Sequence, residues 1–518
     1  MVDSSSEPSS TNRAESARNL ISLLETLLED DQASNTRDIL SGIESLLLTL
    51  TPWQPLYAAF HDGQVHDPLG GGAYAFREDL IEPLLFELAH EEVLTPQDGP
   101  GQPHERRVCG LPTRPIIIHA GAQPNNSPHC GTLIVFCYAF ALARAIRDRM
   151  QAKAAATKPD TSEWKPPPVS VEITFIDTAP VSSEGLEIDG IHYQKSYRDV
   201  PGALAQRMSD YEEILGLLSA WSDIPCTTAF QSDFFSHPSM PDLVRYLVAN
   251  HRVLGRQLSP KYGALALRAA CPAPGCGLAE KHGRLNRYEG IDTDNPTIVF
   301  HCPRHGEHSM TVPSSSSSFP SKSPPSCPSL QEPETNLSRL EANALARNLL
   351  RSMLHLSDRA THHVRVTGAD YAGTYQEAFL YRPLPAWSAS TTTTSAIGGD
   401  AAASTARGRT PHIFYAPLVV DWSGAKLSKS LYVREGGYAT MGLLGTEGLA
   451  GYDRLKAGCC SRGDVHGGGD GNEGLKRVWE EVCRWVADPR RLFRCFFVEY
   501  LKRVVIEGRP CGEADGEE

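Results

Sequence analysis

Apolar positions recur along the chain in patterns typical of alternating strands and helices. Short runs rich in β-branched residues predict strands at 115–119, 170–176, 297–301 and 412–420, with helices between them. This alternation favours an α/β fold with a parallel sheet. Leucines at helical spacing over 16–50 predict two further amphipathic helices, whose expected role is core packing.

The segments around these patterns differ in composition. We expect a disordered tail, an N-terminal helical region, a central domain and a helical C-terminal region with a flexible Gly-rich loop, at 1–15, 16–110, 111–435 and 436–518. Low-complexity segments at 313–335 and 388–409 interrupt the central domain. We expect them to be insertions in surface loops, because patterned sequence resumes after each.

Charge and targeting signals narrow the classes of function. Lys and Arg number 49 against 62 Asp and Glu, a net charge of -13, which argues against a DNA-binding protein coated in basic surface but allows a local basic face. The start, MVDSSSEPSSTNRAES, lacks the basic and apolar regions of a signal peptide. The apolar run Leu133–Ala143 is too short to span a bilayer. We therefore expect a cytoplasmic protein without membrane contact, in which paired cysteines suggest a metal before a disulfide.

One loop joins a predicted strand to a long apolar helix, in IIIHAGAQPNNSPHCGTLIVFCYAFALARAIRDRM (116–150). A strand that ends at a small-residue turn and restarts as a helix presents backbone N–H groups to a phosphate. The loop therefore predicts a phosphate-binding site that carries His129. The alternative role for His129 is to cap the helix.

A second loop carries two lysines, in PLVVDWSGAKLSKSLYV (417–433). Lys426 and Lys429 flank small hydroxyl residues, and two lysines in a mobile loop can follow the charge on a triphosphate as it shifts toward pyrophosphate. Such a run is a weak signal alone. Joined to the upstream PNNSPHCGTL, it is strong.

Together the two loops resemble the "HIGH" and "KMSKS" signatures of class I aminoacyl-tRNA synthetases. The resemblance implies a Rossmann-like catalytic domain over 111–435, in which a Gly-x-Asp turn within VRVTGADYAGTYQEAFLY (364–381) meets the ribose. Thr132 stands where a second histidine is usual and carries no positive charge, so ATP activation could be slowed or lost. The implied catalytic residues are His129, Thr132, Lys426 and Lys429. The implied contacts to the nucleotide or the tRNA terminus are His119, Gly121, Asn126, Gly131, Gly368, Asp370, Ser428 and Ser430.

Cysteines and histidines cluster within 268–312, in CPAPGCG and FHCPRHGEH. Cys271, Cys276 and Cys302, with His305 or His308 as the fourth ligand, form two short knuckles that suit a structural, tetrahedral zinc. The alternative is a set of unpaired buried cysteines. A zinc ribbon between the two signatures resembles the catalytic half of class I lysyl-tRNA synthetases.

In that subfamily an acidic residue on a strand after the first helix contacts the substrate. The matching stretch here is VEITFIDTAP (171–180), so Asp177 is the candidate for binding a basic side chain or an α-amino group. The alternative role for Asp177 is to cap the next turn as a buried residue at the end of a strand.

The resemblance to a full synthetase ends after Ser430, because we expect no sizeable anticodon-reading domain within the 88 residues (431–518) that follow. The remaining helical pattern has a local basic face, which could contact an RNA backbone or be a solvated surface. Its members are Lys476, Arg477, Arg484, Arg490, Arg491, Arg494, Lys502 and Arg503.

This outline is similar to that of fungal arginine-containing cyclodipeptide synthases. The similarity implies acyl transfer between arginyl-tRNA and a second aminoacyl-tRNA, with Cys130, Ser127 and Ser232 as conceivable nucleophiles that lack a visible base. Three alternatives stay open: an ATP-dependent lysyl- or arginyl-type tRNA ligase, a tRNA-independent amino-acid ligase, and a non-catalytic RNA-binding paralogue. Zinc is the expected cofactor, with ATP possible.

Overall fold

The computed structural model describes residues 79–94, 111–156, 164–314, 337–372, 411–421, 451–458 and 471–508 without Arg494, and short pieces between 60 and 76, 383 and 387, and 424 and 449. Internal contacts divide the chain into two units, 1–56 and 57–518, and every described residue belongs to the second. The two helices expected over 16–50, both low-complexity insertions and most of the Gly-rich loop lie outside the described residues.

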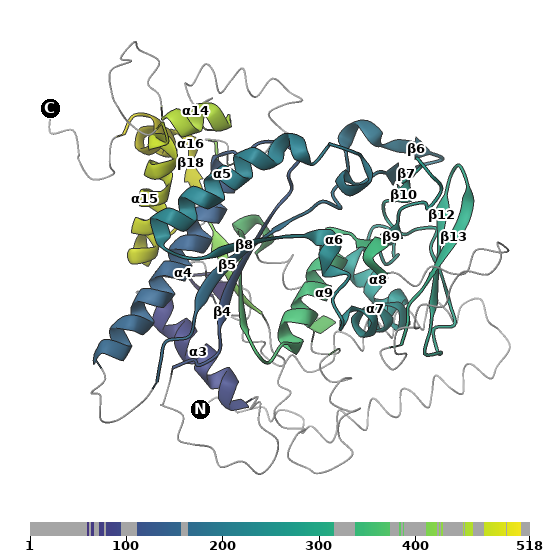
Figure 1. The fold of residues 1–518 in the computed structure, drawn as a ribbon, viewed down its shortest axis with the longest axis horizontal. Coiled ribbons are helices and arrows are strands. Elements are labelled where there is room, and N and C mark those ends of the chain that lie inside the picture. Colours follow the sequence, from purple (N-terminus) through teal and green to yellow (C-terminus); the bar gives the residue numbers. More distant parts are fainter. Residues whose placement is uncertain are drawn as a thin grey trace, which may run out of the picture. The chain divides into compact units, whose positions relative to one another are not determined.

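Six parallel strands form the central sheet (Figure 1), which confirms the expected α/β class. Their order is β1 (Phe60–His61), β16 (His412–Ala416), β15 (His362–Gly368), β4 (Ile116–Ala122), β5 (Val169–Phe175) and β8 (Cys226–Phe230). The chain runs outward from β4 through β5 to β8, then restarts at β15 on the other side of β4. In such sheets ligands bind beyond the carboxyl ends of the strands where the order reverses, which here is between β4 and β15.

Helices cover the two faces of the sheet differently. The face that carries Ile116 and Ile118 of β4 packs on α4 (Cys130–Ala156), and both isoleucines are fully buried. The helices α3 (Ile81–Leu94), α5 (Ala205–Ser222) and α15 (Glu473–Ala487) pack around α4. The helix α9 (Ala344–Ser357) lies on the other side of the strands (Figure 1).

The helix α4 is long and apolar enough to cross a membrane, judged by length and composition alone. The uncharged run Leu133–Ala143 therefore underestimated the length of the apolar segment. In the structure 67% of its most apolar window is buried inside the protein. A helix that is apolar on all sides is expected when the sheet and other helices surround it. Its burial, rather than its length, therefore identifies α4 as a core helix.

Between β8 and β15 the chain forms a largely antiparallel insert. Its helices and strands are α6 (Gln231–Phe234), α7 (Met240–Ala249), α8 (His251–Leu258), β9 (Leu267–Ala269), β10 (Ala279–Glu280), β11 (Arg287–Glu289), β12 (Thr297–Cys302), β13 (Gly306–Thr311) and β14 (Leu340–Ala342). They form the sheets β11-β12-β13 and β14-β9, and β10 joins the hairpin of β6 (Leu186–Ile188) and β7 (Ile191–Gln194). The strand expected at 297–301 therefore exists, but it lies in an antiparallel sheet rather than in the parallel one.

The single strand expected at 412–420 is divided at Pro417, which has no N–H to donate to a neighbouring strand. After this break β17 (Leu418–Val420) pairs with β18 (Cys495–Phe497), so the C-terminal region is not helical throughout. Its other elements are α14 (Tyr452–Ala457), α16 (Val498–Leu501) and a π-helical turn at Lys502–Ile506. The N-terminal region is also not wholly helical, since β1, β2 (Gln64–His66) and β3 (Gly72–Phe76) precede α3. Short 3-10 helices occur at Ser182–Glu184, Tyr197–Asp199, Leu337–Arg339, Ala369–Tyr371 and Pro489–Arg491.

Two buried histidines at the amino ends of strands pair with glutamates of α3. His412 contacts Glu91 (3.0 Å) and Glu87 (3.4 Å), and His362 contacts Glu92 (2.8 Å). Burial alone would lower the pKa of His412, but the two glutamates raise it to about 9. Burial alone would raise the pKa of Glu92, but hydrogen bonds from His362 and from residues 113–114 lower it to about 2.

We expect these pairs to make stability depend on pH in two directions. The His412 contribution should be complete below its unfolded pKa of 6.5 and be lost as the pH rises through about 9. The Glu92 contribution should be complete above 4.5 and be lost as the pH falls through about 2. Urea unfolding at a series of pH values should show that His412→Gln flattens the decline between 6.5 and 9. The exposed His237→Gln is the control, and an unchanged slope in His412→Gln would contradict this assignment.

Candidate functional site

The loop between β4 and α4 is held by a tyrosine from another helix. Tyr211 of α5 is fully buried, and its hydroxyl donates a hydrogen bond to the carbonyl oxygen of Asn126 (2.9 Å). The Asn126 side chain accepts a hydrogen bond from the backbone N–H of Ser127 (2.9 Å). These bonds fix the Pro-Asn-Asn-Ser turn directly before the first turn of α4, where backbone N–H groups and the helix dipole favour an anion.

His129 immediately precedes α4. Its carbonyl oxygen accepts hydrogen bonds from the N–H groups of Thr132 (2.9 Å) and Leu133 (3.0 Å), and its Nδ1 lies 3.4 Å from the Thr132 nitrogen. Since Nδ1 accepts in this long cap contact, the ring proton is assigned to Nε2. A Cβ at Gly131 would lie 2.9 Å from the His129 ring, so only glycine leaves room for this ring position.

A second part of the edge is built by the turn after β15 and the lysine loop. Lys426 Nζ lies 2.6 Å from Asp370 Oδ2, an ion pair between residues 56 positions apart in the chain. A Cβ at Gly368 would lie 2.5 Å from Asp370 Oδ1, so this glycine lets the carboxylate fold back over the end of β15. The backbone N–H of Leu427 donates to the carbonyl oxygen of Val419 (2.7 Å), which holds the lysine loop against β17.

The other residues expected to contact the nucleotide or the tRNA terminus do not all lie at the carboxyl edge of the sheet. Gly121 is exposed near the end of β4, and Thr132 is half-buried in the first turn of α4. His119 lies further back in β4 and is buried, where it contacts Glu172 and His363. Ser428, Lys429 and Ser430 lie outside the described residues.

The role expected for Asp177 stays a prediction, but the structure defines its contacts. Its carboxylate is buried beyond the end of β5 and accepts hydrogen bonds from the N–H (3.0 Å) and the hydroxyl (2.5 Å) of Ser232. Burial raises the pKa of Asp177, and the hydrogen bonds from Ser232 offset this only in part. Among the candidate nucleophiles, Ser232 therefore has a carboxylate partner, Asp177, that no sequence pattern revealed. Cys130 is a poor nucleophile, because burial raises the pKa of its thiol to about 12.

A buried ionic network supports the segment that carries Asp177. Glu341 is completely buried and accepts hydrogen bonds from Arg268 (2.7 Å) and Ser196 (2.6 Å). It also forms an ion pair with Arg198 (3.0 Å), and Arg268 donates to the carbonyl oxygen of Thr178 (2.8 Å). These contacts join the insert to the end of β5. No motif in the sequence indicated them, because their residues come from four separate segments.

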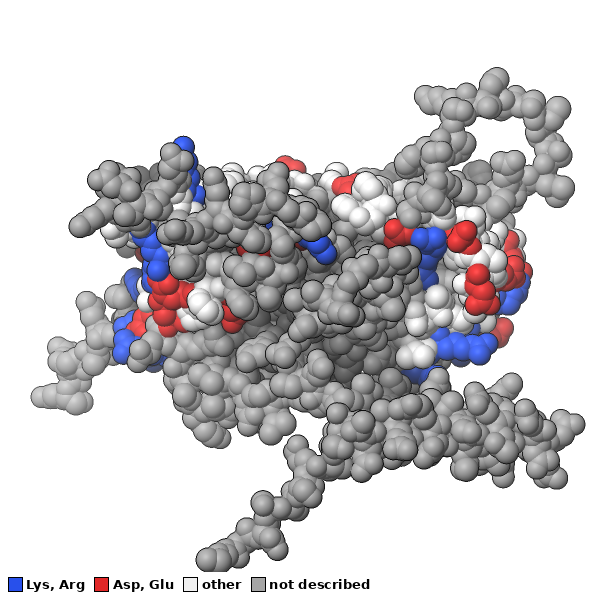
Figure 2. All heavy atoms as spheres, turned by 90° about the horizontal axis from the view of Figure 1, so that it is seen from below, with Lys and Arg blue, Asp and Glu red and all other residues white. Residues whose placement is uncertain are grey.

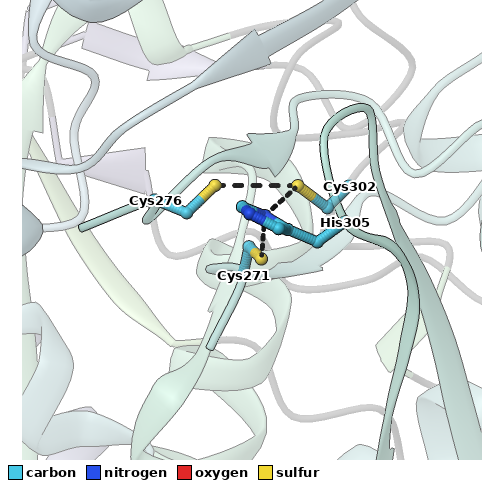
Figure 3. A group of neighbouring side chains, drawn as sticks. All are labelled: Cys271, Cys276, Cys302 and His305. Carbon is cyan, nitrogen blue, oxygen red and sulfur yellow. Dashed lines mark hydrogen bonds between the residues drawn. The ribbon is translucent and has the colours of Figure 1, made fainter. Parts of the chain in front are cut away.

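Four side chains converge within the insert (Figure 3). The ligand atoms of Cys271, Cys276, Cys302 and His305 all lie within 4.8 Å of one another, so the cluster could hold a metal ion. The Cys276 and Cys302 sulfurs are 3.7 Å apart, and His305 Nδ1 lies 3.4 Å and 3.6 Å from the sulfurs of Cys271 and Cys302. Tetrahedral zinc with bonds of about 2.3 Å to sulfur and 2.0 Å to nitrogen requires about 3.8 Å between sulfurs and 3.5 Å from sulfur to nitrogen. The donor set and its spacing are therefore compatible with zinc.

The backbone around the cluster explains why His305 rather than His308 joins it. In the β12–β13 hairpin Cys302 pairs with Gly306, which places His305 in the turn beside Cys302. His308 pairs instead with Phe300, and its Nε2 lies 3.3 Å from the carbonyl oxygen of Ala269. Backbone N–H groups and the His305 ring lower the pKa of Cys302 despite its burial, whereas burial raises the pKa of Cys271, so of these two thiols only Cys302 favours the thiolate that a metal requires.

Several arginines of the expected basic C-terminal face form ion pairs with acidic side chains. Arg484 pairs with Glu481 (2.6 Å), and Arg490 and Arg491 both pair with Asp488. Arg477 donates to the carbonyl oxygen of Val505 (2.9 Å) and so serves the fold. On the face in Figure 2 the described acidic and basic side chains alternate rather than separate. The described surface in this view therefore lacks a field of a single sign.

Comparisons with known proteins add little to this geometry. No protein-family model matches the chain, and no curated protein matches it. Among solved structures the chain is similar to one described as the crystal structure of a "putative arginyl t-RNA synthetase" from Campylobacter jejuni. The sequences are 9% identical over 84% of this chain and 93% of the other, with a TM-score of 0.22. At this TM-score the likeness does not establish a common fold or function.

Proposed function

We propose that the protein is an enzyme that acts on aminoacyl-tRNA. In its most specific form, the proposal is a cyclodipeptide synthase that joins arginine from arginyl-tRNA to a second aminoacyl group. The contact between Lys426 and Asp370 (2.6 Å) carries the proposal, because it brings the lysine loop to the Gly-x-Asp turn of the strand next to β4. The loop before α4 leaves the same edge of the sheet, at the point where α/β sheets bind ligands.

Each of these groups suits a part of a tRNA acceptor end. Asp370 can accept hydrogen bonds from ribose hydroxyls, and Lys426 can bind a phosphate once a ligand competes for its partner. The Lys426 and Asp370 side chains are 42% and 34% exposed, so their ion pair is weakly stabilising and can open. His129 and the first turn of α4 can bind a second phosphate. Thr132 in place of a histidine supports a substrate that arrives already activated.

The reaction needs two acyl transfers. The α-amine of one aminoacyl ester attacks the carbonyl carbon of the other, a C–N bond forms, and the C–O bond to the tRNA ribose breaks. The amine proton passes to the departing ribose oxygen. The second amine then attacks the remaining ester in the same way and closes the ring.

A route through Ser232 would need one more transfer. The Ser232 oxygen would attack the first ester, Asp177 would accept the hydroxyl proton (2.5 Å), and the C–O bond to the first tRNA would break, with the departing ribose oxygen taking up a proton. The α-amine of the second aminoacyl-tRNA would then attack the serine ester and release the Ser232 hydroxyl before the ring closes.

The test supplies the protein with pre-charged arginyl-tRNA and a second aminoacyl-tRNA, without ATP. We expect an arginine-containing cyclic dipeptide by mass spectrometry, and ribonuclease should abolish it. Free arginine and uncharged tRNA should give no product. No cyclic dipeptide with any aminoacyl-tRNA in a total charged pool would contradict the synthase.

An ATP-dependent ligase is the second candidate, and the paired lysine motif favours it. That enzyme would catalyse amino-acid-dependent pyrophosphate exchange and leave stable aminoacyl-tRNA as its product. Adding ATP, amino acids and uncharged tRNA to the same protein distinguishes the two. Pyrophosphate exchange without a cyclic dipeptide would favour the ligase, whereas tRNA binding without either activity would favour a non-catalytic paralogue.

A further inference from the structure

Three histidines meet on the side of the central sheet that faces α9. Since side chains alternate along a strand, His119 of β4, Glu172 of β5 and His363 of β15 point away from the face packed on α4. His355, in the last turn of α9, completes the group. Its ring centroid lies 4.4 Å from that of His119 and 4.3 Å from that of His363.

Hydrogen bonds to carboxylates assign the protons on two of these rings. His119 Nδ1 lies 3.1 Å from Glu172 Oε1, and His363 Nε2 lies 2.9 Å from Asp358 Oδ2. A carboxylate accepts, so these two ring nitrogens carry the protons. The remaining nitrogens, His119 Nε2 and His363 Nδ1, lie 2.8 Å apart, which is a hydrogen bond if one ring carries a second proton and a contact between two acceptors if both rings are neutral. Two facing lone pairs repel, and a cation between them or beside them removes the repulsion.

We propose that His119, His355 and His363 bind one divalent transition-metal ion, such as Zn²⁺. Their ligand atoms all lie within 4.8 Å of one another. Imidazole nitrogen is a preferred donor for such ions, and three histidines leave a fourth position for a water. Glu172 and Asp358 hold the outer nitrogens in the way that carboxylates orient metal-binding histidines in general.

Binding requires a small movement of the rings. Two nitrogens on tetrahedral zinc are separated by about 3.3 Å, so His119 and His363 must part slightly. The rings of His355 and His363 are stacked with 13° between their planes, and one of them must turn to aim its lone pair at a shared ion. A neighbouring cavity of about 30 Å³, lined by His355, His363 and Asp358 among others, has room for one or two waters.

The charges around the cluster allow a cation. Glu172 and Asp358 supply carboxylates to the cluster, and His355 also lies near two guanidinium groups. Those of Arg351 and Arg365 are directed to the side-chain oxygens of Gln231 (2.6 Å) and Asn348 (3.0 Å). A bound ion would join β4, β15 and α9, so its expected role is structural. This inference is independent of the proposed function.

The test counts metal equivalents. Full-length protein is loaded with Zn²⁺, freed of excess by chelating resin and analysed by mass spectrometry. We expect two zinc ions per chain, one in the cysteine cluster and one on the histidines. Asp358→Asn should weaken the second by about 10- to 100-fold, because the amide donates to His363 Nε2 and forces its proton onto Nδ1. Asp358 also accepts a hydrogen bond from the Ala360 N–H through Oδ1, and asparagine retains that acceptor.

Two further variants decide the assignment. Asp148→Asn removes an exposed carboxylate elsewhere and should keep both ions. His355→Ala should lose only the histidine-bound ion, and cobalt should then show only the sulfur-to-metal absorption of the cysteine cluster. A single zinc in the parent protein, all of it on the cysteines, would overturn the proposal and leave a shared proton between His119 and His363. Two ions retained in both Asp358→Asn and His355→Ala would also overturn it.

Discussion

Replacing Cys276 with serine should remove one zinc per chain and unfold the antiparallel insert around it. The three cysteines of the cluster are buried, and the apolar core that contains them is small, with Tyr193 and Leu278 as its other fully buried members. Such a core contributes little burial free energy. Metal binding at structural zinc sites contributes on the order of 10 kcal/mol to folding, so its loss should dominate.

Metal analysis and limited proteolysis test this expectation. Cys276→Ser and His305→Ala should lower the zinc content by one equivalent and expose residues 268–312 to protease. His308→Gln is the matched control, because His308 lies on the same hairpin outside the cluster. Cys483→Ser controls for the loss of a half-buried thiol elsewhere. Unchanged zinc and protease resistance in Cys276→Ser would remove the metal role from this cluster.

Elements specified by local pattern were predictable from the sequence. The strands expected at 115–119 and 170–176 correspond to Ile116–Ala122 and Val169–Phe175, because continuous β-branched runs are typical of strands buried on both faces. The pattern did not reveal strand partners. Residues 297–301 have the same apolar character but pair with β11 and β13, and β18 forms only because β17, far away in the sequence, lies beside it.

In the candidate sites too, local residue patterns were predictable and contacts between distant segments were not. Residue types and spacing were sufficient to propose Cys271, Cys276 and Cys302 as ligands, but only the hairpin register distinguishes His305 from His308. The role of Tyr211 in holding the loop before α4 has no signal in the sequence, since its partner is a backbone carbonyl 85 residues away.

The histidine cluster on the α9 side of the sheet was equally invisible to sequence analysis. The contact of His119 with a nucleotide or the tRNA terminus stays a prediction, whereas the contacts of its ring with His355 and His363 were not foreseen. These two residues carry no motif of their own. They come together only through the packing of α9 on the parallel sheet, which depends on long-range contacts.

Replacing Lys426 with alanine should lower kcat/KM for an aminoacyl-tRNA substrate by about 100- to 1,000-fold, the usual range for losing one group that stabilises developing charge. The variant should fold normally, because an ion pair as exposed as Lys426–Asp370 contributes little to stability. Lys456→Ala is the matched control. Lys456 forms a comparable ion pair with Glu213, but that pair joins helices α14 and α5 rather than the edge of the sheet.

The substrate whose binding weakens separates the two proposed activities. If Lys426 holds a phosphate of the acceptor end, Lys426→Ala should weaken aminoacyl-tRNA binding at least as much as ATP binding, and the difference from the parent protein should shrink as salt screens the charge. If Lys426 serves adenylation, the variant should lose pyrophosphate exchange while tRNA affinity stays unchanged.

Asp370→Asn tests independently whether the ion pair lies at the site of reaction, because it removes the negative charge that pairs with Lys426 and leaves the lysine in place. Its loss of activity should exceed that of Lys456→Ala only if the ion pair marks the site of reaction. Normal turnover in both Lys426→Ala and Asp370→Asn would place the chemistry elsewhere in the protein.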